Sequence, residues 1–356
     1  MLSVLVIAND LGSLQAIMPV ASKMEANEFR VLYVVPRQRL ADKCLEGRKN
    51  IISFSGNFDQ LVVLKKAISA HKPKLILTGS SVPRQAGMLT VEQSSVILGK
   101  KCNIPVVTVL DAWGYYVERF GISNGRISFL PDLVCALDET CYQDLTKLGL
   151  PSENIVITGN PWMDQFSVTN RAVTSKTQKN LIFVSQPLAE ANYPRKWKYD
   201  QCDLFNILMR AIDVSHLRLQ VHVWAHPSET VYEWHKLVCE YSGAAVLQID
   251  KSREFLAAAD LVLTSHSTIV YQALHLGVPC IVLRPKFNAC DDHLPDRLGL
   301  TVKVLDQNSL GDALSKTLVN GKKMLRASAA IMKSKKIFFS NGTATEHVMS
   351  ELKRYL

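Results

Sequence analysis

The sequence lacks the features of disulfide-rich, zinc-binding and membrane-spanning proteins. Its eight cysteines are scattered, with no Cys-x-x-Cys pair and no histidine spacing that suggests zinc. No apolar run reaches the roughly 18–20 residues of a membrane-spanning helix. The opening residues, MLSVLVIAND, lack a basic leader and a cleavage site, so they predict a first strand and no signal peptide. We therefore expect a reduced, cytoplasmic protein.

Nucleic-acid-binding motifs are also missing. There is no helix-turn-helix spacing, no zinc finger and no aromatic ribonucleoprotein strand, so no nucleic-acid partner is expected. The net charge of +9 instead favours anionic ligands or the inner face of an anionic membrane. Asp291-Asp292-His293 is interpreted as a polar loop, and no metal is expected.

What the sequence has is an alternation of strand-like and helix-like segments. A chain of 356 residues is long enough to form two domains. With no Asn-Gly or Asp-Gly hairpin expected between adjacent strands, the alternation predicts parallel, doubly wound sheets. The polar segment 169–180 is the predicted linker, after a first α/β half ending near residue 168. Ligands of such sheets bind at the carboxyl ends of the strands, and with two halves, in the cleft between them.

The stretch Phe255–Arg284 carries the clearest binding signal. A short strand is followed by the hydroxyl-rich turn 264–268 and a predicted helix, which Gly277 ends before a second strand. Polar side chains and free N–H groups at a helix start suit the phosphate of a nucleotide. The candidate ligands are Ser265, His266, Ser267 and Thr268. That Ser265 and Thr268 only cap the helix stands about level as an alternative.

Asp111 is the candidate catalytic residue. It ends a predicted strand and opens an aromatic segment with Trp113, which is expected to stack on a sugar, and with Glu118 as the next candidate base. The alternative is that Asp111 only caps a turn. Gly12 and Ser13 lie in the first strand–helix turn, where a single glycine is a weak signal by itself. His226 is a candidate phosphate contact, or a structural histidine of the Pro227 turn.

Taken together, these motifs resemble the GT-B superfamily of twin-Rossmann nucleotide-sugar enzymes. Within it, the chain is similar to UDP-N-acetylglucosamine 2-epimerases and to glycosyltransferases of the lipid-A-disaccharide-synthase type. The resemblance covers essentially the whole chain and rests on the order of short motifs. These are Asp138-Glu139-Thr140, Val156–Pro161 with Asp164, His226-Pro227-Ser228-Glu229, Ser265–Pro279 and Gly342-Thr343-Ala344.

The resemblance implies a fold and a domain arrangement. Residues 1–168 would form the acceptor domain and residues 181–339 the nucleotide-sugar domain. A terminal helix within 340–356 would cross back to the first domain. The resemblance also implies that the chain approaches a ligand closely at Gly12 and Ser13. The chain departs from the epimerase pattern at three positions. Ser80 lies in the segment where that family has a catalytic aspartate, and Gln186 in the segment of its catalytic histidine. Gln272 replaces its ribose-binding glutamate and still offers hydrogen bonds.

The expected function is metal-independent transfer of a sugar from a nucleotide sugar to a glycan or lipid-linked acceptor. A UDP sugar is favoured, and a CMP sugar is left open because Ser185-Gln186-Pro187 also resembles some sialyltransferases. The alternatives are a 2-epimerase, hydrolysing or not, and a non-catalytic nucleotide-sugar-binding protein. Two basic–aromatic segments, 193–199 with Arg195 and 333–339, suggest a loop over the donor or peripheral membrane contact, although solvated loops are the simpler interpretation. A homodimer is left open.

Overall fold

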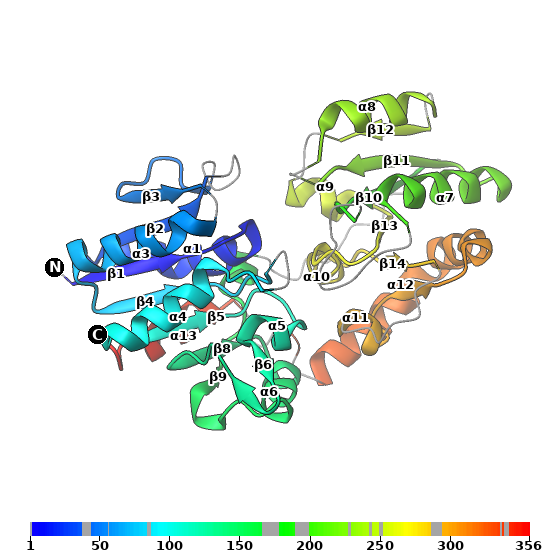
Figure 1. The fold of residues 1–356 in the computed structure, drawn as a ribbon. Helices are drawn as coiled ribbons and strands as arrows, with labels where there is room; N and C mark the ends of the chain where they lie inside the picture. The colour runs from blue at the N-terminus through cyan, green and yellow to red at the C-terminus, as the bar shows by residue number, and fades with distance from the viewer. Residues whose placement is uncertain are drawn as a thin grey trace. The chain divides into compact units, whose positions relative to one another are not determined.

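The structure is a computed structural model that describes residues 2–37, 44–55, 57–83, 87–165, 178–188, 199–226, 229–241, 244–248, 252–285, 294–334, 337 and 342–356. The chain divides into two compact units. The N-terminal unit consists of Met1–Gln165 and Lys335–Leu356, and the C-terminal unit of Phe166–Ser334. Figure 1 shows that each unit is a sheet flanked by helices.

The N-terminal unit is built, within its described residues, on a seven-stranded parallel sheet in the order β3-β2-β1-β4-β5-β8-β9. The strands are β1 (Ser3–Ile7), β2 (Arg30–Pro36), β3 (Ile51–Phe54), β4 (Leu75–Thr78), β5 (Val106–Val109), β8 (Leu133–Ala136) and β9 (Ile155–Ile157). The winding reverses between β1 and β4, because β2 follows on one side of β1 and β4 lies on the other. Ligands of doubly wound sheets bind beyond the carboxyl ends of the strands at such a reversal.

Helices cover both faces of this sheet. They are α1 (Leu11–Ala26), α3 (Asn57–His71), α4 (Val91–Cys102), α5 (Tyr116–Phe120), α6 (Glu139–Lys147) and α13 (Ala344–Leu352), with short 3₁₀ turns η1 (Ser152–Asn154) and η2 (Pro161–Gln165). Val4 and Val6 of β1 belong to the core formed with α1 and α13. Leu5 and Ile7 belong to the core formed with α3 and α4. Burial on both faces explains why β1 is a continuous apolar run.

The terminal helix α13 is anchored to this unit by one carboxylate. Asp164 in η2 accepts hydrogen bonds from the backbone N–H groups of Ala344 and Thr345, at 2.9 and 2.8 Å, and from the Thr345 hydroxyl at 2.7 Å. A carboxylate at a helix N-terminus satisfies otherwise unpaired N–H groups and complements the helix dipole. Val348 and Leu352 are then fully buried in the core with α1.

The C-terminal unit has a second parallel sheet, six-stranded in its described part, in the order β12-β11-β10-β13-β14-β15. The strands are β10 (Lys179–Val184), β11 (Leu219–Trp224), β12 (Ala245–Leu247), β13 (Leu261–Thr264), β14 (Cys280–Leu283) and β15 (Val302–Val304). The helical segments are α7 (Gln201–Val214), α8 (Val231–Cys239), α9 (Arg253–Ala258), α10 (Ile269–His275), α11 (Leu294–Arg297), α12 (Leu310–Ser334) and the 3₁₀ turn η3 (Gln307–Ser309). Phe205 packs edge to face against both Phe183 and Trp234 in its core, and the rings of Phe183 and Trp234 are tilted. This sheet reverses its winding between β10 and β13.

The fold-class prediction of two doubly wound parallel sheets is confirmed, with two local differences. Strand β3 was not expected, because its four residues follow a long polar segment. The expectation of no Asn-Gly hairpin was wrong, because β6 (Ile122–Ser123) and β7 (Arg126–Ile127) pair in antiparallel fashion. Asn124 and Gly125 between them have φ values of 48° and 72°, which a two-residue turn of type I′ requires.

Candidate functional site

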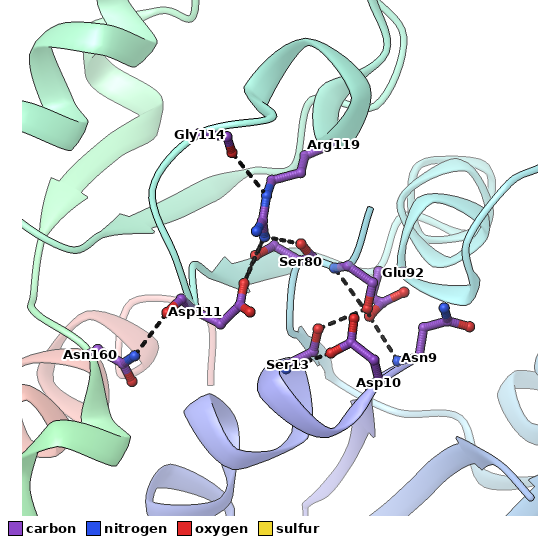
Figure 2. A network of polar contacts seen from close by, with 10 residues as sticks. Asn9, Asp10, Ser13, Ser80, Glu92, Asp111, Gly114, Arg119 and Asn160 are labelled. Carbon is purple, nitrogen blue, oxygen red and sulfur yellow. Dashed lines mark hydrogen bonds and ion pairs between the residues drawn. The ribbon is translucent and has the colours of Figure 1, made fainter. Parts of the chain in front are cut away.

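Three loops of the N-terminal unit meet beyond the carboxyl ends of β1, β4 and β5. The loop after β1 carries residues 9–13, the loop after β4 carries residues 79–81, and Asp111 follows β5. Glu92 from the first turn of α4 and Arg119 from α5 reach the same place (Figure 2). The loops meet because β1, β4 and β5 are neighbours in the sheet and run in the same direction.

The carboxylate of Asp111 is held through one of its two oxygens. Its Oδ1 accepts hydrogen bonds from the Ser80 hydroxyl at 3.0 Å and from the Arg119 guanidinium at 2.6 Å. Its backbone carbonyl accepts a hydrogen bond from the side chain of Asn160 at 3.1 Å. The Asp111 side chain remains 16% exposed. Two charge-assisted contacts on Oδ1 orient the carboxylate without covering it completely.

Arg119 is a buried cation that the sequence analysis did not single out. Besides Asp111, its guanidinium contacts the Ser80 hydroxyl at 2.5 Å and donates to the backbone carbonyls of Ser80 and Gly114. Burial is the largest influence and by itself would lower the pKa of Arg119, but the charge and hydrogen bond of Asp111, together with the charges of Asp10 and Tyr116, raise it. Arg119 therefore stays protonated. Nothing local in the sequence marks it, since its partner is eight residues away across a loop.

Gly12 lies directly beside Asp111, and its predicted close approach to a ligand stays a prediction. A Cβ atom at Gly12 would lie 2.9 Å from Oδ2 of Asp111. Ser13 behaves differently from the prediction of a ligand contact. It is fully buried, and its hydroxyl lies 2.8 Å from that of Ser81. Asp10 caps α1 by accepting the Ser13 N–H at 2.8 Å.

Glu92 is a second residue that the sequence analysis did not single out. It is 4% exposed, and its Oε1 accepts from the backbone N–H of Asn9 at 2.8 Å and the hydroxyl of Ser81 at 2.5 Å. Burial raises the pKa of Glu92 to about 7, the charge of Asp10 adds to the increase, and the hydrogen bonds oppose it. In the sequence, Glu92 two residues after the capping Thr90 indicates only that a helix begins there.

Trp113 and Glu118 do not have the surroundings expected of them. Trp113 is 8% exposed, and its indole N–H donates to both oxygens of Asp138, at 3.0 and 3.1 Å. Its ring is therefore part of the core and does not form a platform for a sugar. The backbone carbonyl of Glu118 accepts from Gln93 at 2.8 Å. Among the residues that the structure describes, no hydrogen bond or ion pair joins the Glu118 carboxylate to the Asp111 cluster.

In the C-terminal unit, the loops after β10 and β13 meet at the reversal of that sheet. The side chain of Gln186 accepts the backbone N–H of His266 at 2.5 Å, and the hydroxyl of Thr264 donates to the carbonyl of Val184 at 2.9 Å. The structure thus brings Gln186 and His266 together. Ser265 is 2% exposed, and its hydroxyl has no hydrogen-bond partner among the described residues. A buried hydroxyl in that condition is suited to bind a ligand.

The remaining residues of the predicted phosphate turn lie at the start of a short helix. Helix α10 has seven residues, so the helix dipole is weaker there than the sequence suggested. Ser267 accepts the N–H of Ile269 at 3.3 Å, whereas Thr268 is exposed and makes no side-chain cap. Thr268 is the N-cap residue by position, but neither its hydroxyl nor that of Ser265 forms a helix-capping hydrogen bond with the described residues. Gln272 is half-buried in the next turn.

His226 lies in a loop that is fixed by a single glutamate. The carboxylate of Glu229 accepts from the His226 backbone N–H, from the Ser185 hydroxyl at 2.7 Å and from the Trp234 indole at 3.1 Å. The His226 residue is exposed. Glu229 was noted only as part of a motif, and it connects the loops after β10 and β11.

Some predictions fall on residues that the structure does not describe. Arg195, the Asp291–His293 loop, Pro227-Ser228 and most of the two basic–aromatic segments lie outside the described residues. In the described part of the chain, no three His, Cys, Asp or Glu side chains are grouped to hold a metal ion. No helix there combines the length and apolar character needed to span a membrane.

Two sequence comparisons give different results. A family model described as UDP-N-acetylglucosamine 2-epimerase matches residues 126–353, which is more than half of the chain. The match begins after Asp111 and Arg119 and includes the whole C-terminal unit. A search of curated proteins finds no match.

Solved structures of two kinds share the fold. S. aureus MnaA with UDP has 16% sequence identity and a TM-score of 0.73, covering 100% of this chain and 97% of that one. The Neisseria meningitidis UDP-GlcNAc 2-epimerase bound to UDP-GlcNAc has 14% identity and a TM-score of 0.67, covering 99% and 100%. The calicheamicin glycosyltransferase CalG4 has 12% identity and a TM-score of 0.66, covering 100% and 98%. At these identities the likeness concerns the fold, and it confirms the predicted GT-B class.

Proposed function

Because the chain belongs to the UDP-N-acetylglucosamine 2-epimerase family, we propose that it acts on UDP-N-acetylglucosamine or a close UDP sugar as a 2-epimerase, hydrolysing or not. Asp111 is the proposed base. The observation that carries the proposal is the geometry of this carboxylate, with Oδ1 anchored by Ser80 and Arg119 and Oδ2 bordered by Gly12. An oriented carboxylate that is still partly exposed is suited to accept a proton from a bound substrate.

Inversion at carbon 2 of a sugar requires that the proton on that carbon leave and return. In the segments where the family has its catalytic aspartate and histidine, this chain has Ser80 and Gln186, and neither side chain takes a proton at neutral pH. The proton must therefore be transferred by one of the carboxylates beyond the carboxyl ends of the strands of the N-terminal sheet. Asp111 is the one among them that is held by an ion pair and still partly exposed, while Glu92 is buried and Asp10 caps α1.

The nucleotide is assigned to the C-terminal unit. Ser265 supplies a buried hydroxyl without a partner among the described residues, and Thr268 supplies an exposed hydroxyl about one helical turn before Gln272. Hydroxyls and N–H groups of this kind bind phosphate and ribose oxygens. His226 is the proposed additional phosphate contact. The Neisseria meningitidis epimerase of the same fold is bound to UDP-GlcNAc, which favours a UDP sugar over a CMP sugar here.

The experiment is incubation of the protein with UDP-N-acetylglucosamine alone in deuterated buffer, followed by proton NMR. The proposal expects the manno-configured sugar, free or UDP-linked, with deuterium at carbon 2. The variant Asp111→Asn keeps the shape of the side chain and is expected to lose the exchange at carbon 2. An unchanged proton at carbon 2, with UDP-N-acetylglucosamine shown to bind by calorimetry, contradicts the proposal.

Glycosyl transfer is the second candidate, and one specific observation favours it. Ser80, which lies in the segment where the epimerases have an aspartate, donates a hydrogen bond to Asp111. Asp111 is therefore a single anchored base. Deprotonation of an acceptor hydroxyl needs one such base. A transferase binds the UDP sugar and leaves carbon 2 unexchanged until an acceptor is supplied. The NMR experiment separates the two candidates, because release of UDP only in the presence of a glycan or lipid-linked acceptor identifies transfer.

A further inference from the structure

The buried Glu92 contacts two loops that are far apart in the sequence. From the loop after β1 it accepts the backbone N–H of Asn9 at 2.8 Å. From the loop after β4 it accepts the Ser81 hydroxyl at 2.5 Å, with the Ser81 N–H at 3.4 Å. Its own helix, α4, is separately capped by Thr90, so Glu92 is not needed to begin that helix. One carboxyl group therefore joins the two loops.

Each of these loops lies beside a different oxygen of Asp111. Ser80, the neighbour of Ser81, donates its hydroxyl to Oδ1. Gly12, three residues after Asn9, borders Oδ2, where a Cβ atom would come within 2.9 Å. The two loops also touch each other directly, because a Cβ at Gly79 would lie 2.4 Å from the Cβ of Ser13. Figure 2 shows Glu92 on one side of this group and Asp111 on the other. Displacing either loop would change the surroundings of the proposed base.

We propose that Glu92 is a positioning residue, which sets the orientation of the Asp111 carboxylate by joining the loop after β1 to the loop after β4. This inference rests on the proposed role of Asp111 as the base. In its proposed role, Glu92 does not contact the substrate. It acts through Ser81 and Ser80 on one side and through the turn 9–12 on the other.

The chemistry of Glu92 makes its effect depend on pH. With its Oε1 accepting from Asn9 and Ser81, its Oε2 is buried and has no partner among the described residues. An ionised oxygen in that condition is costly, and burial, followed by the charge of Asp10, raises the pKa of Glu92 to about 7. The other charged groups of the cluster are Asp111 and Arg119, which pair with each other. Glu92 thus gains or loses its proton near neutral pH.

The first test compares the pH profiles of turnover for wild type and Glu92→Gln. Glutamine keeps the accepting Oε1 but cannot titrate. Wild type is expected to show a change in kcat near pH 7 that is absent in Glu92→Gln, whereas Glu92→Ala, which loses the contacts with both loops, is expected to lose kcat by about tenfold or more with little change in KM. The matched control is Glu139→Gln, which removes an exposed glutamate from the first turn of α6 and is expected to follow wild type. Identical profiles for wild type and Glu92→Gln, or full kcat in Glu92→Ala, would overturn the proposal.

The second test needs no turnover and so separates this inference from the proposed function. In protein with carbon-13-labelled aspartate carboxyls, the Asp111 signal is assigned by its loss in Asp111→Asn and followed through neutral pH. The inference expects a step in that signal in wild type and none in Glu92→Gln. If the chemical shift of Asp111 in wild type does not change as Glu92 titrates, the inference is overturned. If wild type proves inactive on UDP-N-acetylglucosamine, the proposed function fails and this measurement alone decides whether Glu92 positions Asp111.

Discussion

The replacement Glu92→Gln should change how the stability of the protein depends on pH. The folded protein raises the pKa of Glu92 from an ordinary value of 4.5 to about 7. Since the folded-state pKa is the higher one, the folded protein holds an extra proton between these two pH values. The stability linked to that proton is complete below about pH 4.5 and is lost as the pH rises to about 7.

The magnitude follows from the two pKa values. A tenfold change in an equilibrium constant is worth about 1.4 kcal/mol, so the difference between 4.5 and about 7 corresponds to about 3 kcal/mol. Glutamine resembles the neutral acid at every pH. The free energy of unfolding of Glu92→Gln should therefore rise relative to wild type by about 3 kcal/mol between acid and mildly alkaline pH, and then level off.

The assay is urea unfolding followed by circular dichroism, for wild type, Glu92→Gln and the control Glu139→Gln, from about pH 5 to about pH 8. The comparison uses the difference between variants at each pH, so titrations common to all three proteins cancel. A difference between Glu92→Gln and wild type that stays constant to within about 0.5 kcal/mol would refute the reasoning. It would mean that Glu92 ionises in the folded protein as it does in the unfolded chain.

Three further predictions concern other parts of the molecule. Asp111→Asn should leave nucleotide affinity close to wild type and lower turnover by about a hundredfold or more, because proton transfer is lost. It should also lower the melting temperature, because the buried Arg119 loses its ionic partner; a rate within a few-fold of wild type would exclude Asp111 as base. Gly12→Ala should also lower turnover, since its Cβ would lie 2.9 Å from Oδ2 of Asp111. Turnover is measured by enzyme kinetics, with circular dichroism as the control for folding. Unaltered kinetics would show that Oδ2 is not used. Arg284→Met should cost about 3–5 kcal/mol of unfolding free energy in urea, because it leaves the buried Asp296 without its ionic partner, and adding Asp296→Leu should recover part of the loss; a loss below about 1 kcal/mol would contradict the importance of this pair.

The sequence predicts the sheets better than it predicts the site. Buried parallel strands such as Leu261–Thr264 are continuous apolar runs, and helices with clear ends separate them, so the alternation is visible without a structure. The hairpin at Asn124-Gly125 was also predictable, because that dipeptide is a strong signal for a type I′ turn. Strand β3 was not, because four residues with mixed exposure carry too little pattern.

The site depends on contacts between residues that are distant in the chain. Asp111 and Gly12 were identified locally, by their places at the end of a strand and in a turn. Glu92 could not be, since Asn9 lies 83 residues before it and only the pairing of β1 with β4 brings the two together. For Trp113, the residue type suggested a sugar platform, but the sequence does not say which way the ring points. Its bond to Asp138 is a tertiary contact.

The capping of α13 by Asp164 has a consequence for how the protein is made. The core of the N-terminal unit includes Val348 and Leu352, so the part of that core that packs against α13 stays uncovered while the ribosome synthesises the whole C-terminal unit. The C-terminal unit can fold as soon as it emerges, whereas the first unit must wait as a nascent, incomplete intermediate. Its exposed apolar surface on α1 during that interval is where a chaperone would bind, and loss of the Asp164 cap would lengthen the interval.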